Sequence, residues 1–439
     1  MNLIVSKFGG TSVGSASAIK KASEIILKKK ERKVIVVSAV SGITDLLIKA
    51  GLAAARNGRW ALILNAIKKK HADIMNDLSL DLDLTLYWSE LESVLENVQE
   101  SKELTPENKD YLLSFGERLS TKIVASRLEK NAKVLRINAR HIIKTDDTFG
   151  DAKLNSEKTK EAINKILIPN IKKYEKIVIT GFIGANAHGQ YTTFSRGGSD
   201  YTAAILAGLL NAQELEIWTD VDGILTADPK IIAKAKIVKN ISYREAAELS
   251  YFGAKVLHPK TIKPVIKKNI PIRVCNTFNS ARSGTLVTKT SKIGPKSISR
   301  KSGSYVINLY SAEMIESYGF LAKIFSVFLK HQIIADVIST GEASISVTVD
   351  SRPPSQFIQE LKAYADVEVL SGKAIICLVG EDLNQSGTNN TYSRMFSSIK
   401  KYPIDMISQN HSAKNITIVV DQNKSEEVIK SIYEEFFRN

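Results

Sequence analysis

The sequence predicts an α/β fold, in which a large N-terminal domain with a mainly parallel sheet precedes two smaller units. Over residues 1–290, short apolar runs alternate with longer helical segments, and parallel strands need such helices as crossovers. From residue 303 the pattern shortens to two tandem βαββα units, 303–371 and 372–439, which form an internal repeat. Residues 291–302 are rich in Lys and Ser and contain Gly294 and Pro295, so we expect a linker there.

Strands of the N-terminal domain are expected where β-branched residues dominate. Val34–Val40 is such a run and is typical of a strand covered on both faces. Residues 44–130 read as mostly helical, and further helices are expected after Gly198 and over Ala254–Lys268. The other strands expected here are Leu3–Lys7, Lys133–Ile137, Lys176–Thr180, Glu214–Thr219 and Ile272–Cys275.

The two C-terminal units share one order of elements and lack clusters of catalytic residue types, which favours binding or assembly over chemistry. Their expected strands are Tyr305–Leu309, Ile333–Ser339, Ser344–Asp350, Val367–Leu370, Ala374–Val379, Ile404–Ser408 and Ile416–Val420. Their expected helices are Gly319–Lys330, Gln356–Ala365, Thr391–Tyr402 and Ser425–Phe437.

The composition is typical of a globular protein from a reducing compartment. The 439 residues are 44% hydrophobic and 24% charged, and no run approaches the roughly 18 apolar residues that suggest a membrane span. The first ten residues lack the basic and apolar regions of a signal peptide. Cys275 and Cys377 lie far apart, which argues against a disulfide framework or a cysteine metal cluster. We therefore expect a cytoplasmic protein without a membrane partner.

The net charge of +15 raises the possibility of nucleic-acid binding. The excess lies in the first 299 residues, which carry +17, whereas the chain from Arg300 onward carries −2. The lysines form scattered clusters, such as 28–30 and 68–70, without interleaved aromatic residues. We interpret them as solvated faces that also help to collect anionic substrates, and we expect no nucleic-acid partner.

Six short segments carry residue types that could do chemistry, and the first follows the first strand. In Lys7-Phe8-Gly9-Gly10-Thr11-Ser12, the glycines would let backbone N–H groups approach phosphate oxygens, and Lys7 would add a positive charge. Ligands of open α/β sheets lie beyond the carboxyl ends of the strands. The segment could also be only a tight turn between strand and helix, and it is not a Walker motif because its lysine precedes the glycines.

Two further segments lie at or within predicted helices. In Ser38–Asp45, Thr44 could contact a substrate or only cap the following helix. In Ser114–Ser120, Glu117 could be functional or an ordinary solvated side chain.

The segment Ser195–Thr202 is the most specific of the six. It combines Arg196, which can bind a carboxylate through two parallel hydrogen bonds, with a Gly-Gly turn and a helix start that attracts anions. Ser199 or Asp200 would also suit the start of a purely structural helix. The arginine directly before the glycines favours the functional interpretation.

The last two segments indicate a nucleotide. Trp218–Pro229 places three aspartates after a strand, but their spacing differs from that of a calcium-binding EF-hand loop, so we prefer a nucleotide-binding loop to a metal loop. In Phe252–Pro259, Lys255 lies at a predicted helix start, where a cation is unfavourable unless an anion such as a triphosphate lies nearby.

Taken together and in this order, the segments resemble those of the aspartate kinases in the amino acid kinase family, and the resemblance covers nearly the whole chain. The shared stretches are KFGGTSV, SFGERLS, SRGGSDYTAA, WTDVDGI and GAKVLHP. The resemblance implies a three-layer αβα kinase domain over 1–290 and two ferredoxin-like (βαββαβ) ACT domains. It implies transfer of the ATP γ-phosphate to the side-chain carboxylate of L-aspartate, the first step of lysine, threonine and methionine biosynthesis. Mg²⁺ would be carried by ATP, without a dedicated metal site.

The resemblance also assigns roles to single residues around the substrate. Lys7 and Lys255 would contact the transferring phosphates, and Asp200 would orient the lysines. Arg196 would bind the α-carboxylate of aspartate and Glu117 its amino group. The pocket would be completed by Thr44 and Ser199.

The residues implied for ATP binding include two departures from the family pattern. Leu225 stands where many relatives have tyrosine, and Lys230 stands where arginine is frequent, which affects nucleotide affinity but not the reaction. The full implied set is Lys7, Gly9, Gly10, Thr219, Asp220, Leu225, Asp228, Lys230 and Lys255.

The resemblance also implies regulation by an amino-acid effector. It further implies a homodimer or higher homo-oligomer that is joined through the ACT units. L-lysine is the first candidate effector and L-threonine the second, because single-function relatives commonly respond to lysine. Gly341 departs from the pattern of lysine-sensitive relatives, which often carry serine at this position. The two units could instead serve assembly alone. The effector residues implied are Met314, Tyr318, Gly319, Phe320, Leu321, Asp336, Thr340 and Glu342.

Two alternatives to an aspartate kinase remain open from the sequence. One is a kinase of the same fold for another carboxylate, such as glutamate. The other is an amino-acid sensor whose kinase domain has lost its activity.

Overall fold

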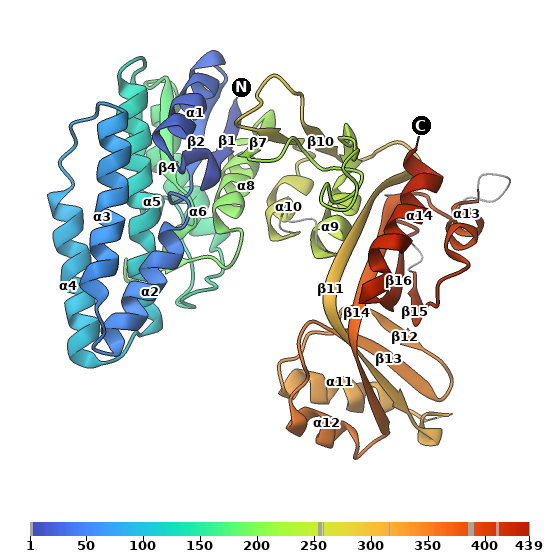
Figure 1. Ribbon diagram of the computed structural model, residues 1–439. Coiled ribbons are helices and arrows are strands. Elements are labelled where there is room, and N and C mark those ends of the chain that lie inside the picture. The colour runs from blue at the N-terminus through green and yellow to red at the C-terminus, as the bar shows by residue number, and fades with distance from the viewer. Residues whose placement is uncertain are drawn as a thin grey trace. The chain divides into compact units, whose positions relative to one another are not determined.

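The computed structural model describes residues 3–252, 257, 259–315, 317–384, 390–409 and 412–438. They form two compact units (Figure 1). The N-terminal unit comprises Met1–Ile224 and Val256–Lys289, and the C-terminal unit comprises Leu225–Lys255 and Thr290–Asn439. The segment 225–255, expected in the N-terminal domain, therefore groups with the C-terminal residues.

The N-terminal unit is built on a mainly parallel sheet, as the alternating pattern predicts. Its strands are β1 (Ile4–Phe8), β2 (Arg32–Val37), β3 (Val134–Ile137), β4 (Lys176–Thr180), β7 (Glu214–Thr219), β9 (Ile272–Asn276) and β10 (Thr285–Thr288). They lie in the order β3-β4-β2-β1-β7-β9-β10, and every neighbouring pair is parallel except β9 and β10. β1 and β4 are buried along their whole length, as their apolar composition requires.

Helices pack against this sheet, and the longest of them come from residues 43–129, where helix was expected. There α2 (Ile43–Ala55), α3 (Trp60–Asp77), α4 (Thr85–Ser101) and α5 (Pro106–Glu129) lie side by side (Figure 1). The remaining elements are η1 (Thr11–Val13), α1 (Ala16–Lys28), η2 (Ala139–His141), α6 (Ser156–Ala162), the π-helical η3 (Ile163–Leu167), α7 (Ile168–Ile171), α8 (Gly198–Leu210), α10 (Pro259–Ile266) and the hairpin of β5 (Ile183–Ala185) and β6 (Tyr191–Thr193).

Helix α5 begins where its sequence predicts and carries its second half into the core. The Thr105 hydroxyl accepts a hydrogen bond from the N–H of Asn108 at 3.1 Å, and Pro106 occupies the first helical position. From Leu112 to Ala125 nearly every side chain is buried, because the sheet covers one face and the neighbouring helices cover the other. Polar side chains on this stretch are consequently held in fixed places.

The C-terminal unit is one continuous antiparallel sheet with helices. Its strands lie in the order β12-β13-β11-β14-β16-β15. They are β11 (Gly294–Tyr310), β12 (Ile338–Thr340), β13 (Ser344–Val349), β14 (Asp366–Glu381), β15 (Met406–Ser408) and β16 (Asn415–Asp421). A short strand earlier in the chain, β8 (Asn240–Ser242), is not part of this sheet. The helices are α9 (Tyr243–Tyr251), η4 (Ala312–Met314), α11 (Phe320–Lys330), α12 (Ser355–Leu361), α13 (Thr391–Ile399), η5 (Gln422–Lys424) and α14 (Ser425–Phe437).

Residues 291–302, expected to be a linker, are instead mostly part of strand β11. Ser297–Ser302 pair with Ala374–Val379 of β14, whereas the second half of β11 pairs with β13 and with the first half of β14. The second βαββα unit contributes only three strands, namely the second half of β14, β15 and β16. Without β11, the edge of β14 opposite β16 would lack a hydrogen-bonding partner. The two ferredoxin-like units therefore share their two long central strands, and the expected break between β strands at 371–372 does not occur.

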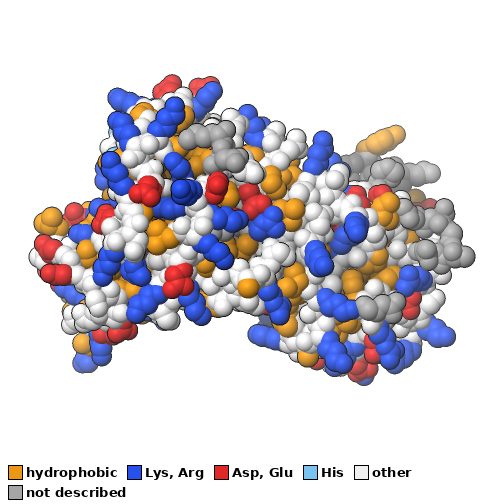
Figure 2. Space-filling model, turned by 90° about the horizontal axis from the view of Figure 1, so that it is seen from above, with side chains coloured by type: hydrophobic (Ala, Val, Ile, Leu, Met, Phe, Trp, Pro, Cys, Tyr) orange, Lys and Arg blue, Asp and Glu red, His pale blue; other side chains and the backbone are white. Residues whose placement is uncertain are grey.

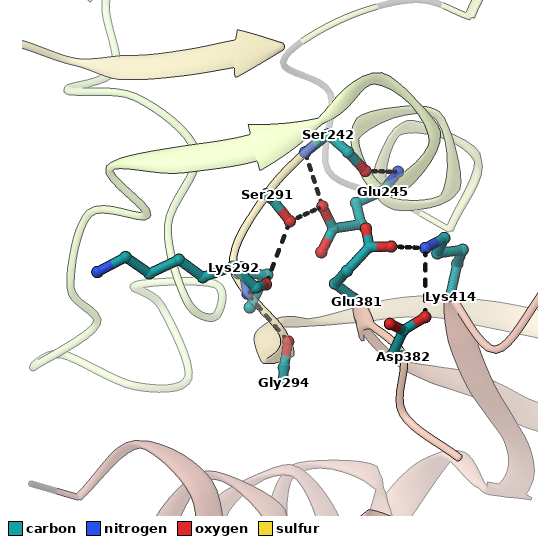
Figure 3. Close-up of polar contacts among 9 residues, drawn as sticks. Ser242, Glu245, Ser291, Lys292, Gly294, Glu381, Asp382 and Lys414 are labelled. Atoms are coloured by element: carbon teal, nitrogen blue, oxygen red, sulfur yellow. Dashed lines mark hydrogen bonds and ion pairs between the residues drawn. The ribbon is translucent and has the colours of Figure 1, made fainter. Parts of the chain in front are cut away.

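The segment that enters β11 is fixed by side-chain contacts within the C-terminal unit (Figure 3). Ser242 and Glu245 form a reciprocal cap at the start of α9. The Ser291 hydroxyl donates to the same Glu245 carboxylate at 2.6 Å, and Lys414 forms an ion pair with Glu381 at the end of β14. The Ser291 contact therefore ties the start of this Lys- and Ser-rich stretch to α9.

One expected strand is shorter in the structure. Ile333–Ser339 was expected to be extended throughout, but β12 covers only Ile338–Thr340. Two backbone bonds, from Asp336 N–H to the Thr348 carbonyl and from Thr348 N–H to the Val337 carbonyl, join the preceding residues to β13 without forming a regular ladder.

Lys and Arg side chains are scattered over the face seen in Figure 2 and are interspersed with carboxylates. No helix of the described residues is both long enough and apolar enough to cross a membrane.

Candidate active site

A cavity of about 490 Å³ opens at the carboxyl ends of the central parallel strands in the N-terminal unit. Its walls come from the ends of β1, β2 and β7, from the start of α8 and from one side chain of α5. This is the edge at which open α/β sheets bind ligands. Nine of the residues predicted for the site line this cavity: Lys7, Gly9, Gly10, Thr44, Glu117, Ser199, Asp200, Thr219 and Asp220.

The central feature of the cavity is an ion pair between β1 and α8. Lys7 Nζ lies 2.6 Å from Asp200 Oδ1, and the two side chains are only 11% and 16% exposed. Asp200 lies in the first turn of α8, where a carboxylate is favoured by the helix dipole. The pair thus holds the lysine ammonium at a defined place on the cavity wall.

Two glycines in the cavity wall leave the backbone uncovered by side chains. A Cβ atom at Gly10 would lie 3.1 Å from the Ala39 carbonyl oxygen, and one at Gly9 would lie 3.4 Å from Lys7 Nζ. The N–H of Gly9 already donates to the Trp218 carbonyl at 3.0 Å, so this residue contributes space more than a hydrogen-bond donor.

The start of α8 is shaped by a second pair of glycines. Gly197 has φ of 80°, a left-handed conformation that glycine adopts without strain, and it sets the direction of the helix. A Cβ atom at Gly181, which follows β4, would lie 2.6 Å from the Ser199 side chain. Close packing of these loops brings Ser199 and the first turn of the helix to the cavity, where its N–H groups favour an anion.

Glu117 projects from α5 into the cavity wall and is only 4% exposed, so the alternative of a solvated side chain is wrong. Its Oε1 accepts a hydrogen bond from the N–H of Ala39 at 3.0 Å, and its Oε2 has no hydrogen-bond partner among the described residues. Burial raises the pKa of Glu117 to about 8, and the Ala39 N–H and the Lys7 charge only partly oppose this shift. A cationic group next to Oε2 would stabilise the carboxylate.

Arg196 does not line the cavity that contains Lys7. It lines a neighbouring cavity of about 390 Å³, together with Lys153, Tyr201 and Lys263. Gly198 lines both cavities, so the two adjoin at the start of α8.

The described residues predicted for nucleotide binding fall in two places. Thr219 and Asp220 end β7 at the cavity, with the Thr219 hydroxyl donating to the Asp220 carboxylate at 3.1 Å. Leu225, Asp228 and Lys230 belong to the C-terminal unit, where the Lys230 N–H donates to Asp228. Their roles stay predictions, and Lys255 lies outside the described residues.

Phe182 is a cavity residue that the sequence did not single out. It has φ of 67°, which is strained for an aromatic residue, and its N–H donates to the Thr202 hydroxyl at 3.1 Å. Its position just after the end of β4 was the available signal, because the ends of β2, β1 and β7 in the same sheet also contribute to the cavity. Among the described residues, no group of three or more His, Cys, Asp or Glu side chains could hold a metal ion.

The residues predicted to bind an effector lie in the first half of the C-terminal sheet. Gly319, with φ of 77°, starts α11, and the Tyr318 and Leu321 side chains beside it are exposed. The Asp336 side chain is 2% exposed and accepts hydrogen bonds from the Tyr251 hydroxyl at 2.7 Å and from Lys301 Nζ at 2.8 Å. The other predicted residues are Met314 in η4, Phe320 in α11, Thr340 in β12 and Glu342 in the following loop.

Comparison with known proteins agrees with this architecture. The chain matches the model of the amino acid kinase family over residues 2–276 and that of an ACT domain over residues 376–436. Aspartokinase 1, chloroplastic, of Arabidopsis thaliana is 37% identical over 462 residues, which cover 99% of this chain and 80% of that protein. Lysine-sensitive aspartokinase 3 of Escherichia coli (strain K12) is 33% identical, and the match covers 99% of both chains. This chain belongs to the aspartokinases of the amino acid kinase family.

Solved structures of the aspartokinase family share the fold. The crystal structure of E. coli aspartokinase III in complex with aspartate and ADP (R-state) has a TM-score of 0.85 and 32% identity, covering 99% of this chain and 100% of that one. The T-state structure of the same enzyme, in complex with lysine and aspartate, has a TM-score of 0.82 and covers both chains completely. The aspartate kinase of Clostridium acetobutylicum has a TM-score of 0.85 and 30% identity.

Proposed function

We propose that this chain transfers the γ-phosphate of ATP to the side-chain carboxylate of L-aspartate and so forms 4-phospho-L-aspartate. The observation that carries the proposal is the cavity that joins the Lys7–Asp200 pair, the start of α8 and the unpartnered Oε2 of Glu117. It offers positive charge for phosphates and negative charge for an amine within one cavity. Aspartokinase III, which shares the fold, holds aspartate and ADP in its R-state structure.

Phosphoryl transfer to a carboxylate requires positioning of the substrates and neutralisation of charge, but it does not require a catalytic base. A carboxylate is already a nucleophile, so the substrate needs only to be held in line with the γ-phosphate. Lys7 would neutralise charge on the transferring phosphoryl group, with Asp200 holding the ammonium in place. The N–H groups at the start of α8, beside Ser199, would stabilise phosphate oxygens.

Aspartate would be recognised through groups at its α-carbon. Glu117 would bind the α-ammonium through its unpartnered Oε2, and the charge of the ammonium would favour the ionised form of this buried carboxyl. Arg196, from the adjoining cavity, would bind the α-carboxylate, and Thr44, in the first turn of α2, would line the pocket.

ATP would bind at the ends of β1 and β7, where Gly9, Gly10, Thr219 and Asp220 line the cavity. The tight glycine backbone fits a phosphate chain, because a side chain at Gly10 would press on the Ala39 carbonyl. Mg²⁺ would be bound together with the nucleotide, mainly through phosphate oxygens, and would supply further charge neutralisation. Asp200 and Asp220, whose carboxylates line this cavity, would be the protein groups that hold it.

The C-terminal sheet would regulate this reaction and assemble the enzyme. We propose that L-lysine, and in second place L-threonine, binds near Gly319 and Asp336, and that exposed apolar side chains such as Leu321, Ile334 and Ile338 face a second copy in a homodimer. Lysine is bound in the T-state structure of aspartokinase III. The reaction would be the first step of lysine, threonine and methionine biosynthesis in the cytoplasm, where Cys275 and Cys377 stay reduced.

Trapping the product tests the proposal. An acyl phosphate reacts with hydroxylamine to give a hydroxamate and free phosphate, so the enzyme with ATP, Mg²⁺, L-aspartate and hydroxylamine should accumulate aspartyl hydroxamate. NMR of the isolated hydroxamate should place it on the side-chain carboxyl. ADP release without any hydroxamate, or a hydroxamate on the α-carboxyl, would contradict the proposed reaction.

A further inference from the structure

We infer that Asp110 is a positioning residue for the aspartate pocket, because its buried carboxylate holds in place the strand end and the loop that surround Arg196. The inference rests on the proposed function and adds a residue that contacts neither substrate. Asp110 lies on α5 and is fully buried.

The Asp110 carboxylate accepts three hydrogen bonds from two other segments. Its Oδ1 accepts the hydroxyl of Thr193 at 2.7 Å. Its Oδ2 accepts the N–H of Thr193 at 2.7 Å and the N–H of Gly150 at 2.9 Å. Donated hydrogen bonds to an ionised carboxylate are among the strongest in proteins, so this buried group fixes both segments to α5.

These two segments form the walls of the cavity that Arg196 lines. Thr193 ends β6 and precedes Arg196 by three residues, while Gly150 precedes the wall residues 151–154. The two walls are also joined to each other, because the N–H of Ala152 donates to the Thr193 carbonyl at 3.0 Å. The Phe194 N–H then donates to the Phe182 carbonyl at 3.0 Å, which ties the same strand end to the cavity of Lys7.

The position of Asp110 on α5 relates it to Glu117, the other residue of this helix that would act in aspartate binding. Asp110 and Glu117 are seven residues apart, about two helical turns, so they lie on one face of the same helix. Glu117 would hold the substrate ammonium, and Asp110 would hold the segment of the arginine that binds the α-carboxylate. The ammonium and the α-carboxylate are bonded to the same α-carbon of the substrate. A single rigid helix would therefore set the distance between the site that binds the ammonium and the site that binds the α-carboxylate.

The test is steady-state kinetics of Asp110→Asn with each substrate varied. Asparagine has the same shape but replaces one acceptor oxygen with an NH₂ donor, which would face an N–H or hydroxyl donor. Loss of hydrogen bonds to a charged group should raise the KM for aspartate about ten- to a hundredfold. The KM for ATP should stay within about twofold, because Asp110 bonds directly only to Thr193 and Gly150, and not to the ends of β1 and β7 where ATP would bind.

Two substitutions at Thr193 and one in the core serve as matched controls. Thr193→Val removes only the hydroxyl bond and should raise the KM for aspartate by a smaller factor, whereas Thr193→Ser keeps the hydroxyl and should behave as wild type. Leu95→Ala, in the apolar core of α4, should lower Tm without changing either KM. It separates loss of stability from loss of positioning.

The inference fails if folded Asp110→Asn has an unchanged KM for aspartate, or if the KM values for aspartate and ATP rise equally. If Asp110→Asn does not fold, an unchanged KM for aspartate in Thr193→Val overturns the inference and an increased one supports it. A wild-type enzyme without aspartate-dependent ADP release would overturn the proposed function itself. Normal wild-type turnover with unaltered variants would overturn only the role of Asp110.

Discussion

Each unit of the molecule contains a partly or fully buried lysine–aspartate pair, and the two pairs have opposite surroundings. In the N-terminal unit, Lys7 and Asp200 face a cavity of about 490 Å³. In the C-terminal unit, Lys301 and Asp336 are enclosed by the Tyr251 hydroxyl and by Asp350, which also forms an ion pair with Lys301. The same two residue types therefore meet an open space in one unit and further protein groups in the other.

The difference indicates two ways of using buried charge. At the first pair, the cavity leaves room for a ligand that brings its own charge, so the pair is suited to act on phosphates. At the second pair, burial raises the pKa of Asp336, but Lys301 and Tyr251 already satisfy its carboxylate. An amine that binds Asp336 would have to displace one of them, which couples ligand binding to a rearrangement of the sheet and of α9.

The largest expected effect comes from breaking the open pair. Lys7→Ala and Asp200→Ala should each lower kcat about a hundred- to a thousandfold, the usual loss for one transition-state charge contact, while the protein stays folded. Turnover and circular dichroism of the purified variants test this, with Lys20→Ala, an exposed lysine on α1, as the control that should keep full activity. Near-normal rates in either folded site variant would remove the pair from the chemistry.

The second effect concerns Glu117, whose Oε2 has no partner among the described residues. Because burial raises its pKa to about 8, the free enzyme should bind aspartate better as pH rises through about 8, when the carboxyl ionises. In Glu117→Gln, kcat/KM for aspartate should be about tenfold lower or more at high pH and should lose this rising limb.

The stability of the protein should show the same titration with the opposite trend. Glu117 binds its proton more tightly in the folded state than in the unfolded state, so its contribution to stability is fully present below about pH 4.5 and falls as pH rises toward 8. Comparing Tm of wild type and Glu117→Gln at pH 5 and pH 8.5 measures this contribution. Parallel pH dependence of Tm in the two proteins would show that Glu117 does not titrate as described.

The next effect concerns the closed pair, Lys301 and Asp336. L-lysine should inhibit wild type, with coupling of about five- to 150-fold between effector and substrate binding. Asp336→Ala should lose the inhibition but keep basal turnover. Activity measured against L-lysine and L-threonine, alone and together, decides between the two effectors, and no response to either up to millimolar concentrations would leave these units with assembly alone.

The smallest effect is expected from Tyr251→Phe, which removes one hydrogen bond from Asp336. Without the tyrosine hydroxyl, one acceptor of the buried carboxylate becomes available to an effector amine. Half-maximal inhibition should then need about two- to tenfold less L-lysine than in wild type, as expected for one neutral hydrogen bond. A higher requirement would mean that the tyrosine hydroxyl supports the effector-bound state.

The parts of the fold that depend on local pattern could be predicted from the sequence. Buried β-branched runs marked the parallel strands, and nine predicted site residues meet in one cavity because parallel strands end at the same edge. The length of β11 and β14 could not be predicted. Their pairing joins residues far apart in the sequence, such as Tyr310 with Asp366 and Gly294 with Glu381, and a Lys- and Ser-rich stretch carries no local sign of it.

Two features of the site also lay beyond sequence patterns. Phe182 reaches the cavity through a left-handed backbone that only the surrounding packing can impose. Asp110 resembles a surface residue near the start of a helix, and its burial follows from the approach of β6 and the loop at Gly150.

The most direct test of the central proposal is ADP release by the wild-type enzyme with ATP and Mg²⁺, measured with L-aspartate, with L-glutamate and without an acceptor. The open cavity with Glu117 and the Lys7–Asp200 pair predicts rapid release with aspartate, at least about tenfold slower release with glutamate, and near-background release without an acceptor. Lys7→Ala should reduce the aspartate-dependent rate to near background, which assigns the activity to this site. Equal rates with aspartate and glutamate, or equal rates with and without an acceptor, would contradict the proposal that this chain is specific for aspartate.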